Sequence, residues 1–104
     1  MFYSIRKVNQ DDTPNLAKLL EDYIQETYKQ RWSGTVEQLE QDIFKKDLEV
    51  FVAETSERKI VALVAWINTY DLHHCMKGGD IIDFYVSPPH RGRGAAVFLI
   101  QRLD

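Results

Sequence analysis

The residues best suited to chemistry lie together near the end of the sequence, in a short segment that follows an apolar stretch. This glycine loop consists of Arg91, Gly92, Arg93, Gly94, Ala95 and Ala96, and it opens a predicted helix. Main-chain N–H groups at a helix start have no partner within the helix, and with the helix dipole they attract anions. Glycines allow close approach of a bulky anion, and arginines add charged donors. The pattern predicts a cradle for a phosphate or pyrophosphate group.

Two common phosphate-binding loops are excluded by their spacing. The sequence has no Gly-x-x-x-x-Gly-Lys-Ser/Thr segment, and no Gly-x-Gly-x-x-Gly follows its first predicted strand. A second group of reactive side chains, His73, His74 and Cys75, matches no standard zinc spacing. We therefore predict an anion site of another kind and no metal site.

The composition is that of one folded domain over residues 1–104. With 44% hydrophobic and 28% charged residues, intrinsic disorder is not expected. Thirteen basic and sixteen acidic residues give a net charge of −3, which argues against a nucleic-acid partner. No apolar run approaches the roughly 20 residues of a membrane span, and the start lacks a signal-peptide pattern. A cytoplasmic protein with neither a nucleic-acid nor a membrane partner is expected.

The periodicity of apolar residues predicts an α+β (mixed α/β) fold with the order β-α-α-β-β-β-α. Predicted strands cover residues 2–8, 48–54, 60–69 and 80–87, and predicted helices cover 14–30, 36–44 and 95–103. Thr13 is expected to cap the first helix. The third strand is apolar on both faces, which indicates a central position in the sheet. Residues 71–79, with their two adjacent glycines, are expected to form a loop.

The glycine loop resembles the Arg/Gln-x-x-Gly-x-Gly/Ala signature of the GNAT superfamily of acetyl-CoA-dependent N-acetyltransferases. The segment before it, Tyr85-Val86-Ser87-Pro88, is similar to the family's fourth strand, and the element order also fits. The resemblance implies a mostly antiparallel sheet with helices on both faces, the GNAT-like acyl-CoA N-acyltransferase fold, truncated after the third helix. It also implies acetyl-CoA as cosubstrate, and as acceptor a primary amine of a small molecule or a protein.

By this resemblance, the main-chain N–H groups from Arg91 to Ala96 bind the pyrophosphate of coenzyme A. The main chain at Tyr85 and Val86 pairs with the pantetheine arm as an added strand would. The N–H of Val86 also helps to polarise the thioester carbonyl. The alternative interpretation of the loop is a basic turn that only caps a helix.

Two aspartates are candidates for the proton acceptor that amine acetylation needs. Asp83 matches a carboxylate position of the diamine acetyltransferase branch, which residues 69–71 and 83–86 resemble. Asp80 lies where other branches carry a glutamate base. The neighbouring acidic position of the diamine branch is Ile82 here. On a regular strand the two aspartates would face opposite sides, whereas a bulge of the kind found in the family would alter the alternation.

The helix over residues 14–30 also carries side chains near the acceptor region of the family fold. Tyr23, Tyr28 and Trp32 are interpreted as packing residues of this helix and the loop after it. Attraction of a cationic amine by Glu26 and Glu37 is an alternative role for this region.

The sequence lacks the fifth strand of the family fold and the fourth helix, whose tyrosine protonates the leaving thiolate. The fourth strand would then be an open sheet edge, which favours association. We expect a homodimer through that edge or the last helix. A fragment of a longer enzyme, or an incomplete module that binds coenzyme A or only a protein partner, are the alternatives.

Overall fold

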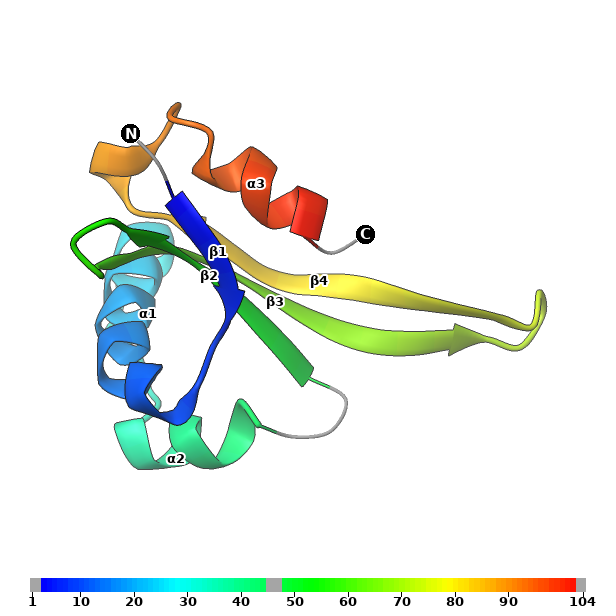
Figure 1. Cartoon of the computed structure of the whole chain (residues 1–104). Coiled ribbons are helices and arrows are strands. Elements are labelled where there is room, and N and C mark those ends of the chain that lie inside the picture. The colour runs from blue at the N-terminus through cyan, green and yellow to red at the C-terminus, as the bar shows by residue number, and fades with distance from the viewer. Residues whose placement is uncertain (1–2, 45–47, 103–104) are drawn as a thin grey trace.

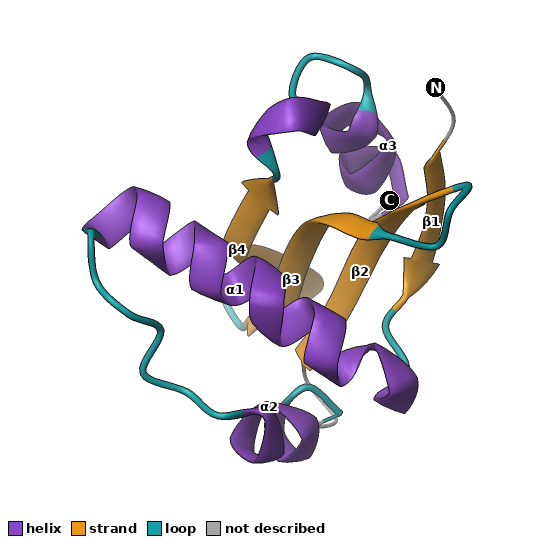
Figure 2. Cartoon of the chain, turned by 90° about the vertical axis from the view of Figure 1, so that its left-hand side faces the viewer, coloured by secondary structure: helices purple, strands orange, loops and turns teal. Residues whose placement is uncertain are grey.

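The fold is built on one antiparallel sheet of four strands in the order β1-β2-β3-β4, seen in a computed structural model that describes residues 3–44 and 48–102. The elements are β1 (Tyr3–Lys7), η1 (Gln10–Asp12), α1 (Thr13–Tyr28), α2 (Val36–Asp42), β2 (Leu48–Thr55), β3 (Ile60–Asp71), β4 (Met76–Val86), η2 (Pro88–His90) and α3 (Ala95–Arg102). Helices α1 and α2 lie on one face of the sheet and α3 on the other (Figures 1 and 2). The predicted fold class is confirmed.

Each face of the sheet has its own apolar core. Successive side chains of a strand point to opposite faces, so Leu63 packs with the α1 side and Val64 with the α3 side. Strand β3 lies between β2 and β4, and it is buried on both faces from Ile60 to Ala65 because α1 packs on one face and α3 on the other. The predicted central position of this strand is confirmed.

Helix α1 starts from a charged cluster rather than from the predicted threonine cap. Thr13 is already the first helical residue, and its hydroxyl donates to the Gln10 carbonyl oxygen at 2.9 Å. The carboxylate of Asp12 accepts two hydrogen bonds from the Arg6 guanidinium, at 2.6 and 2.8 Å, and Arg6 also binds Glu54 at 2.9 Å. The cluster joins β1, β2 and the start of α1, and its central carboxylate, Asp12, is only 6% exposed.

The end of α1 also differs from the prediction, because the helix stops at Tyr28. Lys29 adopts a left-handed conformation with φ of 58°, and its N–H donates to the Gln25 carbonyl oxygen. A left-handed residue closes the helix two residues before the predicted end at residue 30.

The predicted loop over residues 71–79 is wrong for its second half. Strand β4 already begins at Met76, and Gly78 and Gly79 pair with Thr69 and Asn68 in the ladder. The glycine at 79 serves packing, since a Cβ there would lie 1.9 Å from Cζ2 of Trp66. Strands β3 and β4 therefore extend beyond the rest of the sheet as a projecting two-stranded hairpin (Figure 1).

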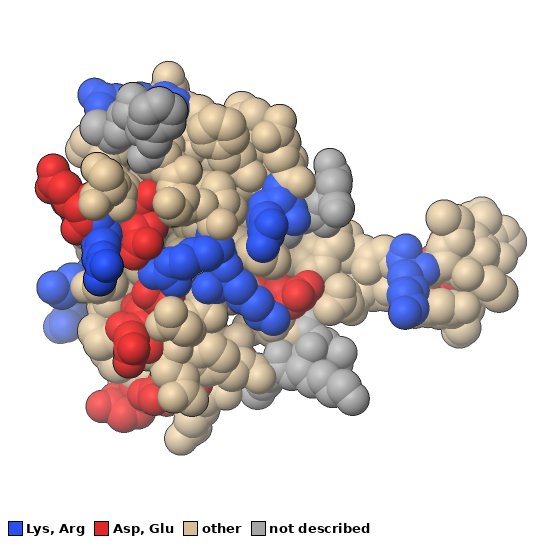
Figure 3. All heavy atoms as spheres, in the orientation of Figure 1, with Lys and Arg blue, Asp and Glu red and all other residues tan. Residues whose placement is uncertain are grey.

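Charges of both signs are interspersed over the body of the molecule on the face drawn in Figure 3. The projecting hairpin shows mainly uncharged side chains in the same view. Among the described residues, no helix is both long and apolar enough to cross a membrane.

We expect Asp12→Asn to lower the free energy of unfolding by about 1.5–3 kcal/mol near neutral pH, as for other hydrogen bonds to charged groups. The hydrogen bond from Arg6 lowers the pKa of Asp12 below its ordinary value. The stabilisation is therefore complete above the unfolded pKa of about 4 and is lost as the pH falls through the lower folded pKa. Urea unfolding of both proteins from neutral pH to about pH 3 measures this loss.

Asp11→Asn is the matched control, because Asp11 is exposed on the same turn and its carboxylate has no hydrogen bond among the described residues. A stability difference between wild type and Asp12→Asn that stays constant with pH would contradict the charge-based explanation.

Candidate functional site

The free edge of β4 presents the main chain of Val86. The Ser87 N–H donates to the Val61 carbonyl oxygen at 2.8 Å, so Val61 and Ser87 form a hydrogen-bonded pair. Such pairs alternate in an antiparallel ladder, and the next pair, Ala62 with Val86, is therefore not hydrogen-bonded. The N–H and C=O of Val86 consequently point away from β3. The Arg91 Nε donates to that outward carbonyl oxygen at 2.9 Å.

Tyr85 has the opposite arrangement. It pairs with Leu63 in the ladder, so the same alternation directs its N–H and C=O toward β3. The pairing with a ligand that the sequence predicts for Tyr85 is not open to its main chain in this structure, whereas Phe84 and Val86 face the edge. The ring of Tyr85 is buried on the α1 side, and this burial raises the pKa of its hydroxyl.

The glycine loop after β4 has the backbone that its composition predicts. Gly92 and Gly94 have φ angles of 75° and 92°, which other residues adopt only with strain. No atom lies within 4 Å of the place where a Cβ of Gly92 would be. The Gly94 carbonyl oxygen accepts the N–H of Phe98 at 3.1 Å and thus opens α3. The first N–H groups of that helix lack partners within the helix, so the loop has the donors of an anion site.

The side chain of Arg91 ties the loop to α1 instead of extending from it. Its guanidinium forms an ion pair with Glu26 and lies 5.5 Å from the centre of the Tyr85 ring. The Glu26 carboxylate raises the pKa of Arg91 above its ordinary value. The Arg91 N–H donates to the Pro88 carbonyl oxygen at 3.2 Å. Arg91 therefore fixes the loop, and the first N–H groups of α3 are the loop's donors for an anion.

A β-bulge places the two candidate aspartates on one face of the sheet. Asp83 pairs with Ala65, but Ile81 pairs with Trp66, so Ile82 is an extra residue in β4. Asp80 pairs with Ile67, two residues from Ala65 in β3. Because residues two apart share a face, both carboxylates belong to the face covered by α1 and α2.

Asp83 is the aspartate that lies within the structure of this face. It is half-buried, and its Oδ1 accepts a hydrogen bond from the Tyr23 hydroxyl at 3.1 Å. Burial and the neighbouring carboxylate raise the pKa of Tyr23, so its hydroxyl stays a donor. Asp80 is exposed at the base of the projecting hairpin and makes no hydrogen bond or ion pair to the described residues. The geometry thus favours Asp83 as a group that meets a ligand.

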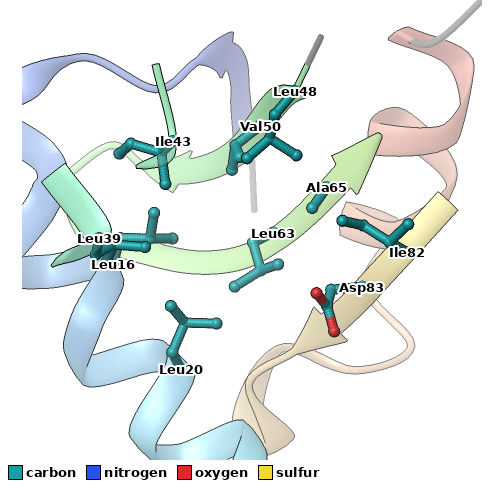
Figure 4. A pocket seen from close by; sticks show the side chains of 10 residues that line it. All are labelled: Leu16, Leu20, Leu39, Ile43, Leu48, Val50, Leu63, Ala65, Ile82 and Asp83. Carbon is teal, nitrogen blue, oxygen red and sulfur yellow. The ribbon is translucent and has the colours of Figure 1, made fainter. Parts of the chain in front are cut away.

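Asp83 lines two pockets. The larger, of about 460 Å³, lies among α1, α2, β4 and the segment that joins the two helices. Its lining includes Tyr23, Trp32, Ser33, Gln38, Asp42 and Asp83. The smaller, of about 110 Å³, lies between α1, α2 and the sheet (Figure 4). No described residue that lines either pocket is basic, and no described group of His, Cys, Asp and Glu could hold a metal ion.

Sequence reasoning missed the roles of two α1 residues. Tyr23 does pack, with its ring centre 5.2 Å from that of Tyr85, but it also binds Asp83. Attraction of a cationic amine is the alternative role that the sequence suggests for Glu26, whose carboxylate binds Arg91 in the structure. The spacing of Tyr23 and Glu26 puts both on one face of α1, which is the only signal the sequence holds for a joint role.

Comparisons with protein families and with solved structures both point to acetyltransferases. The sequence model of the acetyltransferase (GNAT) family matches residues 13–104. No curated protein matches the chain closely enough to count as a relative. Among solved structures, a ribosomal-protein-alanine N-acetyltransferase from Brucella melitensis biovar Abortus 2308 superposes with a TM-score of 0.83 at 22% identity, covering 99% of this chain and 69% of its own.

Two further structures show the same fold. An aminoglycoside acetyltransferase from an uncultured soil metagenomic sample has a TM-score of 0.80 at 20% identity, covering 98% of this chain and 67% of its own. A possible acetyltransferase from Clostridium difficile 630 has a TM-score of 0.77 at 18% identity, covering 99% and 69%. The chain thus spans about two thirds of the length of these structures.

We expect Glu26→Gln to loosen the glycine loop, because it removes the charged partner that holds Arg91. The ion pair is about half exposed, so the loss is small, and amide hydrogen exchange in residues 91–96 should speed up about two- to fivefold. Hydrogen exchange followed by mass spectrometry or NMR measures this change.

Glu37→Gln is the matched control, since Glu37 is an exposed acid of α2 with no hydrogen bond or ion pair to the described residues. Equal exchange rates in the loop of both variants would show that Glu26 does not fix it.

Proposed function

Because this chain belongs to the acetyltransferase (GNAT) family, we propose that it transfers an acetyl group from acetyl-CoA to a primary amine of a small molecule or a protein. The observation that carries the proposal is the placement of Asp83 and Val86 three residues apart on β4, about 10 Å along the strand. Asp83 adjoins two pockets, and Val86 directs its N–H to an open edge that leads into the glycine loop.

The residues of the chain fit the parts of acetyl-CoA. The open space beside Gly92 and the first N–H groups of α3 suit a pyrophosphate, with Arg93, Gly94, Ala95 and Ala96 in the same loop. The edge of β4 suits the amide-bearing pantetheine arm, which would add to the sheet as a strand does. When bound, acetyl-CoA supplies an activated acyl group. Donation from the Val86 N–H to its carbonyl oxygen would stabilise the charge that develops there.

The acceptor would arrive as an ammonium ion and must lose a proton before it attacks. We assign proton removal to Asp83, directly or through water, with the Tyr23 hydroxyl holding one of its oxygens in place. In the transfer, the amine nitrogen bonds to the carbonyl carbon and the carbon–sulfur bond breaks. Of the two protons lost by the ammonium, one neutralises the leaving thiolate and one goes to solvent. Tyr85 is packed on the α1 side, and no residue of this chain is assigned as the acid.

Membership of the diamine branch, the location of the protein and its partners are parts of the proposal. Residues 69–71 lie in the projecting hairpin at the end of β3, away from the pockets that Asp83 lines. The similarity of that segment to the diamine branch therefore does not bear on the acceptor. A location in the cytoplasm and the absence of nucleic-acid and membrane partners remain predictions.

A homodimer is the proposed assembly. Strand β4 has an open edge along its length, and α3 exposes Val97, Phe98 and Ile100 on its outer side. A second copy paired along α3 would cover these side chains and leave the edge of β4 to pantetheine, whereas a copy paired along β4 would compete with pantetheine for that edge. Sedimentation at about 10–100 µM should give twice the monomer mass, and a monomer throughout that range would refute the dimer.

A module that binds coenzyme A without turnover is the second candidate, favoured by the open β4 edge and the lack of an assigned acid. A thiol-release assay with a panel of amines separates the two functions. An enzyme frees coenzyme A faster than buffer does, whereas a binding module does not.

Asp83→Asn should reduce the rate of acetyl transfer by about 10²- to 10⁴-fold, the usual contribution of a positioned proton acceptor. Asp80→Asn should reduce it less than tenfold, because Asp80 is exposed and lines neither pocket. Glu57→Gln, in the turn between β2 and β3, is a charge-matched control. A larger loss for Asp80→Asn than for Asp83→Asn would exchange the two assignments.

Gly92→Val should weaken acetyl-CoA binding at least tenfold in calorimetric titration, because the new side chain would occupy the open space expected to hold the pyrophosphate. Gly78→Ala, in the hairpin, is the control substitution of a glycine away from the loop. Unchanged affinity of Gly92→Val for acetyl-CoA would refute the assignment of the loop.

A further inference from the structure

We propose that the acceptor at Asp83 is a primary amine carried on a short apolar group, whose hydrocarbon enters the smaller of the two pockets. This inference rests on the proposed function and specifies its substrate class. Its basis is the contact of one carboxylate with a pocket that is otherwise apolar (Figure 4).

The smaller pocket is suited to hydrocarbon and to little else. Every described residue that lines it, apart from Asp83, is apolar, and Leu16, Leu39, Leu63 and Ile82 come from four different elements around it. A cavity with such a lining excludes water and takes up apolar molecules; one of about 150 Å³ holds benzene. At about 110 Å³, this pocket has room for a somewhat smaller group, such as a short alkyl chain.

Asp83 offers a partner for the amine group at the end of that hydrocarbon. Figure 4 shows its carboxylate beside Ile82 and across from Leu20 and Leu63. The Tyr23 hydroxyl occupies Oδ1, and Oδ2 accepts no hydrogen bond from the described residues. An ammonium group at Oδ2 would therefore have an unshared acceptor, while its alkyl chain lies against leucine side chains.

The bulge makes the site selective for one positive charge. As the extra residue of β4, Ile82 lies next to Asp83 at the pocket, where a second acid would be needed to bind a second ammonium. With isoleucine there, a diamine would place its far ammonium among apolar side chains without a partner, which is strongly unfavourable. The structure therefore favours a monoamine over a diamine of equal length.

The larger pocket is the place where a different acceptor class would bind. Its lining contains Gln38, Ser33 and Trp32 in addition to acids, so a peptide N-terminus or a polyhydroxylated amine could be accommodated there. We favour the smaller pocket because its apolar lining suits only one class of ligand. Asp83, the proposed proton acceptor, lines this pocket as well.

The test is a thiol-release assay on the full chain with linear primary amines from ethylamine to hexylamine, each paired with the diamine of the same length. Each methylene that enters the pocket should raise kcat/KM about fourfold until the pocket is filled. Each diamine should react at least tenfold more slowly than its monoamine partner. A rate independent of chain length, or a preference for diamines, would overturn the proposal.

Two isoleucines of β4 provide a matched pair of variants. Ile82→Glu adds a carboxylate beside the pocket and should raise kcat/KM for the diamine relative to the monoamine at least tenfold. Ile81→Glu adds the same charge one residue away, but Ile81 pairs with Trp66 and belongs to the opposite face. Both isoleucines are nearly half exposed, at 46% and 45%, so both variants should fold. Equal selectivity in the two variants would refute the role of the pocket.

Controls with other acceptors separate this inference from the proposed function. If peptide or aminoglycoside amines are acetylated and alkylamines are not, the enzyme is confirmed and the apolar substrate class is refuted. If acetyl-CoA does not bind in calorimetric titration and no amine of any class releases thiol, both proposals fail. A rise in melting temperature with butylamine alone, absent in Ala65→Leu because leucine would fill the pocket, would support the binding site independently of turnover.

Discussion

The β-bulge at Ile82 is the constraint on which the candidate site depends. A one-residue shift in a strand moves every following side chain to the other face of the sheet. Without the extra residue, Asp80 and Asp83 would point to opposite faces, and Trp66 would no longer meet Gly79 on a common face. The bulge therefore puts Asp80 on the same face of the sheet as Asp83 and the pockets that Asp83 lines.

Helix α1 connects the two halves of the site. Through Tyr23 it holds Asp83, the proposed proton acceptor, and through Glu26 it holds Arg91, at the start of the glycine loop. The Tyr85 ring lies between these contacts, against Tyr23 on one side and Arg91 on the other. The opposite end of α1 is fixed to the sheet by the charged cluster around Asp12. One helix anchored at both ends thus sets the distance between the Asp83 carboxylate and the glycine loop.

The fold by itself does not specify which acceptor is used. The solved structures that share it are named as enzymes for different acceptors, a ribosomal protein in one case and an aminoglycoside in another. In the proposed function, selectivity would therefore come from the side chains around Asp83 rather than from the arrangement of strands and helices. In this chain those side chains form an apolar pocket on one side and a mixed pocket on the other.

The sequence by itself determined the features that depend on neighbouring residues. Apolar periodicity predicts the elements and the central position of β3. The glycine loop is recognisable because a positive φ angle, as at Gly92, favours glycine in the sequence. The two aspartates were found, but not their common face. Gly78 and Gly79 read as a turn in the sequence, because the ring that covers Gly79 belongs to Trp66, 13 residues earlier in the chain and on the neighbouring strand.

Only the tertiary structure decided the bulge, the Tyr23–Asp83 hydrogen bond and the Glu26–Arg91 ion pair. These contacts join residues that are 60 and 65 positions apart in the chain. Local propensity carries no information about which face of α1 meets which end of β4. That choice follows from the burial of two apolar cores on opposite faces of one sheet, which fixes α1 above β3 and brings its polar side chains to the carboxylate and the loop.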